Sequence, residues 1–174
     1  MAFITLTDDE LAEVRLHLGN RVTSQQISDE QLRSKTIEQA ASDYVLESIL
    51  KDINVHALGD AQDEYVDIRD GTADESAITS FLNTALKIPQ LEQFRRAVIY
   101  RASGLAAGAV DRQLSEGAIG INQRVAAKPW EVLQASLFQR CDEEIERLRN
   151  AFPNDAFPSQ EQRARASYQL FQVV

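Results

Sequence analysis

The chain has 174 residues, of which 44% are hydrophobic and 26% are charged, and its formal net charge is −9. This composition argues against disorder throughout, and one compact domain of this length buries roughly 70% of the surface that its unfolded chain exposes. Residues 1–75 hold 17 Asp or Glu against 6 Lys or Arg and so carry −11, which excludes a phosphate clamp in that half.

Two helix starts near the N-terminus share one pattern. Leu-Thr-Asp-Asp-Glu-Leu at 6–11 and Ile-Ser-Asp-Glu-Gln-Leu at 27–32 each place a hydroxyl residue three positions before a Glu or Gln. The two side chains then satisfy each other's backbone N–H groups, and the flanking apolar pair fixes how the chain enters the helix. The first helix is expected to be short, because Gly19 comes directly after its last apolar residue and tolerates the positive φ of a helix end.

Residues 29–53 are expected to form one long or once-broken helix, in which Glu38, Asp43 and Glu47 face away from the apolar stripe. That stripe consists of Ile37, Ala41, Tyr44, Val45, Ser48 and Ile49. The next stretch, 54–71, holds acids and two glycines. It predicts a surface loop with a short strand at 64–68.

A third capping pattern, Thr-Ala-Asp-Glu at 72–75, predicts a helix that Pro89 prevents from continuing smoothly. Another helix is expected beyond Pro89, and residues 102–109 of it are nearly all small. Small side chains let two helix backbones approach closely. Two alternatives remain open for this stripe: packing within the chain, or packing against a neighbouring subunit.

Residues 115–123 contain two glycines and predict a protruding hairpin or loop that carries Ile119 and Ile121. Pro129 is then expected to open the last long helix. The chain changes character after Phe152, where an arm begins that ends on the apolar residues Tyr168, Leu170, Phe171, Val173 and Val174. This end either docks onto the core of its own domain or adds a strand or an apolar plug to a partner.

Together these elements predict an all-α fold, a bundle of four to five main helices with a protruding loop and an extended C-terminal arm. The helical domain covers residues 1–152 and the arm covers 153–174. The uneven charge has two explanations: a solvated surface, or oppositely charged ends that steer subunits together.

The residue types that carry catalysis are sparse. His17 and His56 lie far apart, without the neighbours of a nucleophile or zinc site. The acids within 60–70 lack the alternation and the final Glu of an EF-hand, and no glycine loop for phosphate occurs. We therefore expect no enzyme, no cofactor and no metal. The basic cluster is too sparse to predict nucleic-acid binding; it consists of Arg95, Arg96, Arg101 and Arg112.

Cys141 is the single cysteine, so no internal disulfide is possible and a reducing compartment is expected. The first six residues lack a basic segment followed by a long apolar one. No run approaches the ~18 apolar residues of a membrane span. The sequence thus predicts neither export nor membrane insertion.

The order of these parts resembles that of the head–tail connector (adaptor) proteins of tailed bacteriophages, over about residues 5–150. The resemblance rests on the two capped starts, on Ala-Ala-Ser-Asp-Tyr-Val at 40–45, on Ala-Val-Ile-Tyr-Arg-Ala at 97–102 and on Glu-Gly-Ala-Ile-Gly-Ile at 116–121. The acidic stretch 54–71 and the long C-terminal arm depart from the compact members of the family.

The resemblance implies a structural, non-enzymatic virion protein in the neck, present in the host cytoplasm during assembly. Its copies would form a cyclic homo-oligomer, twelve-fold in the family, that bridges the portal protein to a stopper or tail protein. DNA would be only passing cargo. The interface residues expected on this interpretation are Ile119 and Ile121 of the loop, and Tyr168, Leu170, Phe171, Val173 and Val174 of the arm.

Two other classes of protein compete with this interpretation. A helical DNA-binding packaging protein or regulator should show a basic recognition helix, whereas the first two helices both begin with acids. An enzyme that uses the acidic stretch with a metal is the third class.

Overall fold

The structure is a computed structural model, and it describes residues 5–19, 22, 27–85, 88–116 and 124–151. All regular elements in these ranges are helical, and none of the described residues lies in a strand. The predicted all-α fold is therefore confirmed.

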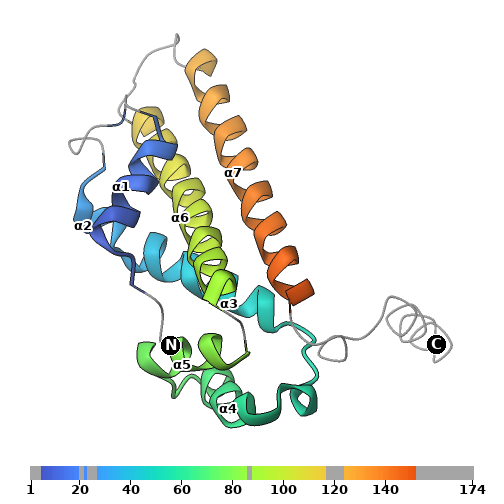
Figure 1. Ribbon diagram of the computed structural model, residues 1–174. Coiled ribbons are helices and arrows are strands. Elements are labelled where there is room, and N and C mark those ends of the chain that lie inside the picture. Colours follow the sequence, from blue (N-terminus) through green and yellow to red (C-terminus); the bar gives the residue numbers. More distant parts are fainter. Residues whose placement is uncertain (1–4, 20–21, 23–26, 86–87, 117–123, 152–174) are drawn as a thin grey trace, which may run out of the picture.

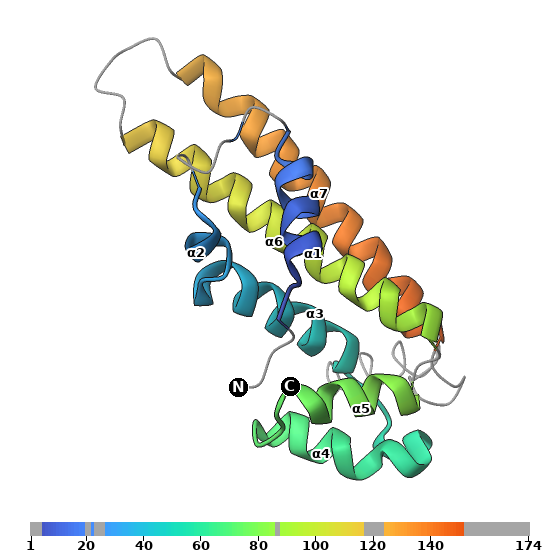
Figure 2. The same ribbon diagram turned by 60° about the vertical axis from the view of Figure 1, so that its left-hand side comes forward.

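Two long antiparallel helices, α6 (Ile88–Glu116) and α7 (Arg124–Ala151), run side by side along the molecule (Figures 1 and 2). The helix α1 (Asp8–His17) packs on α6, and α3 (Ala40–Leu50) packs on both long helices. A hairpin of α4 (Gln62–Asp70) and α5 (Glu75–Ala85) lies at one end of this bundle (Figure 2).

The stripe of small residues on α6 packs against α7 of the same chain. A Cβ atom on Gly104 would clash with Cε1 of the Phe138 ring, and one on Gly108 would clash with Nε2 of Gln134. The Gln134 amide also donates to the carbonyl oxygen of Gly104 at 3.1 Å. At Gly104 and Gly108, therefore, the small residues pack within the chain, which is the first of the two alternatives.

Both predicted capping boxes are confirmed. The Thr7 hydroxyl accepts from the Glu10 N–H at 3.3 Å, and the Glu10 carboxylate accepts from the Thr7 N–H at 2.8 Å. Ser28 and Gln31 make the same exchange at 3.2 and 2.8 Å. Gly19 has a φ of +79°, as expected just beyond the first helix.

The predicted third helix start is also present, although Asp74 caps it. The Asp74 carboxylate accepts from the Ala77 N–H at 2.8 Å, whereas the Thr72 hydroxyl donates to the backbone carbonyl of Asp67 at 3.2 Å. Pro89 is the second residue of α6, where a helix requires no N–H donor.

Residues 29–53 follow the once-broken alternative. A short helix, α2 (Asp29–Leu32), ends at Arg33. The chain then continues from Ser34 through a π-helical turn, η1 (Lys35–Gln39), directly into α3. This helix ends at Leu50, before Asp52 takes a φ of 62°.

The prediction of a loop with a strand at 54–71 is wrong. The structure has a 3₁₀ helix, η2 (Val55–Ala61), followed by α4, and Gly71 ends α4 with a φ of +73°. The buried side chains are spaced three and four residues apart, so they form one helical face. They are Leu58, Ala61, Tyr65 and Ile68.

The prediction that Pro129 opens the last helix is wrong. Pro129 lies inside α7, which begins at Arg124. A proline in this position lacks the N–H that would bond to the carbonyl four residues earlier. The helix accommodates the loss of that bond instead of starting at the proline.

Glu38 was expected to face away from the core, and this prediction is also wrong. Glu38 is 2% exposed, and its carboxylate accepts a hydrogen bond from the Leu6 N–H at 2.7 Å. Arg33 donates to the carbonyl of Leu6 at 3.0 Å, and its Nη1 lies 3.9 Å from the Glu38 carboxylate. The carboxylate turns inward because the buried N–H of Leu6 has to be satisfied there.

Further polar contacts hold the segment before α1. Glu75 of α5 accepts from the backbone N–H and the hydroxyl of Thr5, both at 3.0 Å. Arg95 of α6 donates to both carboxylate oxygens of Glu10 at 2.6 and 2.7 Å. Burial alone would raise the pKa of Glu10, but the hydrogen bonds from Arg95 and Thr7 bring it below its ordinary value.

We expect Gly104→Ala to destabilise the protein and Gly108→Ala to have a much smaller effect. The new methyl group at 104 meets the Phe138 ring, whereas at 108 it meets the end of a flexible glutamine side chain. Overpacking should exceed the gain in helix propensity, which leaves a net loss of about 1–2 kcal/mol for Gly104→Ala. Urea denaturation of both variants measures this, and equal effects would contradict the expectation.

Glu38→Ala should cost about 1–3 kcal/mol, because the substitution leaves the buried N–H of Leu6 without an acceptor. Glu38→Gln keeps an oxygen acceptor of the same length and should cost less. Thermal unfolding of the two variants compares them. A Gln variant as unstable as the Ala variant would refute the role given to this hydrogen bond.

Candidate functional site

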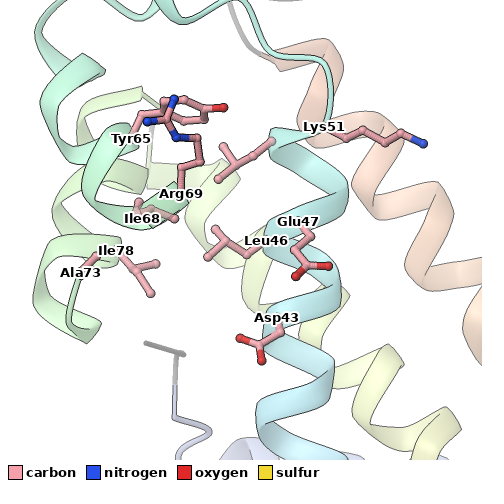
Figure 3. Close-up of a pocket in the computed structure, with 10 residues that line it drawn as sticks. Asp43, Leu46, Glu47, Lys51, Tyr65, Ile68, Arg69, Ala73 and Ile78 are labelled. Carbon is pink, nitrogen blue, oxygen red and sulfur yellow. The ribbon is translucent and has the colours of Figure 1, made fainter. Parts of the chain in front are cut away.

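A cleft of about 420 Å³ separates α3 from the α4–α5 hairpin (Figure 3). Its lining is mostly apolar and comes from both walls. Leu46 and Leu50 belong to α3, and the opposite wall consists of Tyr65, Ile68, Ala73 and Ile78. We call this space the hairpin groove.

Charged side chains border the hairpin groove along α3. Asp43, Glu47 and Lys51 follow one another at intervals of four residues and so lie along one side of the helix. Arg69 of α4 stands opposite, close to Tyr65, and its Nε donates to Asp70 at 2.9 Å. The α3 wall of the groove is thus acidic along Asp43 and Glu47, whereas the Lys51 side chain points away from the hairpin (Figure 3).

Asp43 is the polar group with the most unusual surroundings in this groove. Its Oδ1 atom is buried and has no hydrogen-bond partner among the described residues. Burial, and then the charge of Glu47, raises the pKa of this carboxyl. Burying a carboxylate oxygen without a hydrogen-bond partner costs free energy, and a donor or cation bound in the groove would reduce that cost.

The size and lining of the hairpin groove suit recognition of apolar side chains. Binding clefts in proteins span about 300–1,000 Å³ and combine an apolar lining with a few polar groups. No group of three His, Cys, Asp or Glu that could hold a metal is found in the part of the chain that the structure describes.

A second cleft, of about 310 Å³, lies between α3 and α7. Arg149 borders it and donates to the carbonyl oxygens of Ser48 and Lys51 at 3.1 and 3.0 Å. These hydrogen bonds satisfy carbonyl groups that the end of α3 leaves without helical partners. Lys51 borders both clefts, and Arg149 near the end of α7 donates to its carbonyl oxygen.

The interface residues predicted from the sequence lie outside the described residues. Ile119 and Ile121 belong to the connection between α6 and α7, and the residues of the arm follow the end of α7. The roles of these seven residues stay predictions: Ile119, Ile121, Tyr168, Leu170, Phe171, Val173 and Val174.

The candidate chemical residues are placed separately. Nε2 of His17 on α1 lies 3.7 Å from Oε1 of Glu13, and the centroid of the imidazole ring is 5.1 Å from that of the Tyr100 ring. His56 is exposed in η2. Burial raises the pKa of Cys141 to about 12, which keeps this side chain as a thiol at neutral pH.

Two arginines of the predicted basic cluster are engaged within the chain. Arg95 binds Glu10, and the guanidinium of Arg101 lies between the rings of Tyr44 and Phe138, 3.6 and 4.0 Å from their centroids. Both arginines therefore stabilise contacts between helices.

Sequence reasoning missed the hairpin groove because it treated one wall as a loop. The regular three- and four-residue spacing of Leu58, Ala61, Tyr65 and Ile68 was the available signal. The acids and glycines around these residues outweighed that signal.

Among the described residues, no helix is both long and apolar enough to cross a membrane. Comparisons with protein-family models, curated proteins and solved structures gave no match to this chain.

We expect the stability of the protein to fall as the pH drops through the titration of His17. Burial lowers the pKa of this imidazole below the ordinary 6.5, the charge of Arg140 lowers it further, and Glu13 opposes them. Below about pH 6.5 the unfolded chain therefore takes up a proton that the folded chain resists, and the loss is complete below the folded pKa.

Urea denaturation from about pH 7.5 to about pH 5.5 measures this loss, largely above the ordinary carboxylate range. His17→Gln should flatten the curve relative to the wild type. Glu13→Gln should steepen it, because Glu13 is the group that raises the pKa of His17. Superimposable curves for the wild type and His17→Gln would contradict the assignment.

Proposed function

We propose that this protein is a structural adaptor of the phage head–tail connector type, whose copies form a ring between the portal and a stopper or tail protein. The observation that carries the proposal is the long α6–α7 pair. Its two ends lead into the two segments with predicted interface residues: the connection 117–123 and the C-terminal arm.

Hydrogen bonds between distant segments of the chain support this role. A ring subunit has to hold its contact surfaces at fixed angles, because heterologous contacts close a ring only at one rotation. Glu38, Arg95 and Arg149 each tie together segments that are distant along the chain. Such ties favour a protomer that moves as one body.

The uneven charge supports DNA as passing cargo. Residues 1–75 carry −11, and phosphate is repelled from surfaces that carry this sign. Because Arg95 and Arg101 are engaged within the chain, the alternative of a DNA-binding regulator gains no support from them.

The arm is the proposed contact with the portal. We expect purified protein to sediment with a portal ring encoded in the same genome, and a chain truncated after Phe157 to lose this binding. Native mass spectrometry of the protein alone gives the number of copies in the ring. A matched control, the full chain with Val132→Ser at an exposed site on α7, should bind like the wild type.

Two results would overturn the proposal. The first is unchanged portal binding by the truncated chain combined with a monomeric mass at high concentration. The second is tight, salt-sensitive binding to duplex DNA, which would favour the regulator.

A further inference from the structure

The hairpin groove has an apolar lining on both walls, so an occupant would be stabilised mainly by the removal of its own apolar side chains from water. Leu46, Ile68 and Ile78 line the groove although each is itself largely buried, so the space between them is what an occupant would fill (Figure 3). The chain holds one apolar stretch beyond α7 that could serve.

We propose that residues 168–174 of the C-terminal arm occupy the hairpin groove of their own chain when the protein is free. This stretch reads Tyr-Gln-Leu-Phe-Gln-Val-Val and contains five apolar side chains and no charged one. The apolar lining of the groove matches this composition, and its volume of about 420 Å³ takes a few side chains at a time.

The chain between α7 and the apolar stretch is long enough to reach the groove. Arg149 donates to the carbonyl oxygen of Lys51, so α7 ends beside α3, on the side of that helix away from the hairpin (Figure 3). Sixteen residues, 152–167, separate Ala151 from Tyr168 and span at most about 58 Å when extended. The wall from Asp43 to Lys51 is only about 12 Å long, at 1.5 Å per helical residue.

Charge favours one placement of the arm over the other. Arg163 and Arg165 precede the apolar stretch, whereas the α3 wall of the groove is acidic along Asp43 and Glu47. A guanidinium there would supply the donor that the buried Oδ1 of Asp43 lacks among the described residues. The arm is therefore placed with its arginines at the Asp43 end.

Attachment to the same chain makes even a weak contact sufficient. A tether of this length holds the stretch at an effective concentration in the millimolar range. Docking keeps the apolar side chains of residues 168–174 out of water until a partner binds them instead. This inference concerns the free protein, so it stands or falls separately from the proposed ring.

The test uses the full chain with Ser167→Cys, labelled with a nitroxide beside the apolar stretch. Cys141 remains a buried thiol, so the label attaches at 167. In a methyl-labelled sample, the NMR signals of Leu46, Leu50, Ile68 and Ile78 should lose most of their intensity. Leu16 and Val132, which do not line the groove, should keep theirs.

Two variants check the cause of the loss. Leu170→Ser with Phe171→Ser removes two apolar side chains of the arm without changing any residue of the described helices, and it should restore the groove signals. Glu47→Lys should also restore part of the intensity of the groove signals, because a positive charge at this position repels Arg163 and Arg165. Its matched control, Glu131→Lys at an exposed site on α7, should leave the loss unchanged.

A mixed sample identifies the chain that supplies the arm. Methyl-labelled protein without nitroxide, mixed with unlabelled protein that carries it, should show intact groove signals. Loss of these signals in the mixed sample would mean that a second copy supplies the arm, and would overturn the proposal. The proposal would also be overturned if, in the chain that carries both the nitroxide and the methyl labels, the groove signals were as strong as those of Leu16.

Discussion

The close packing of α6 on α7 is the constraint on which the rest of the structure depends. At Gly104 the Phe138 ring fills the space that a Cβ would occupy, so the two backbones approach as only small residues allow. The same ring forms one side of the pocket for the Arg101 guanidinium, and Tyr44 of α3 forms the other. One contact point thus joins three helices, and α1 then packs on α6.

Buried polar contacts add what apolar packing alone does not specify. The carboxylate of Glu38 holds the chain just before α1, and the carboxylate of Glu10 holds Arg95 of α6. A buried donor that loses its acceptor costs more than a satisfied pair gains, so these contacts strongly disfavour other arrangements of the same helices. Glu38, Glu10 and Arg95 therefore serve the architecture of the chain.

Features that depend on neighbours within a few residues were predictable from the sequence. The capping boxes at Thr7 and Ser28 involve partners three positions away, and Gly19 ends a helix by its own backbone freedom. Glu38 was not predictable, because its partner lies 32 residues away and a carboxylate is normally exposed. The hairpin groove was missed for a similar reason: its walls meet only in the folded chain, and composition hid the helix that carries Tyr65 and Ile68. The interface residues of the arm stay predictions.

The two hydrogen bonds from Arg149 to the end of α3 have a mechanical consequence. They join the last turn of α7 to a helix that is a hundred residues earlier in the sequence. Tension applied to the chain beyond Ala151 is therefore shared with α3 and does not load α7 alone. Whatever grips the arm also pulls on one wall of the hairpin groove.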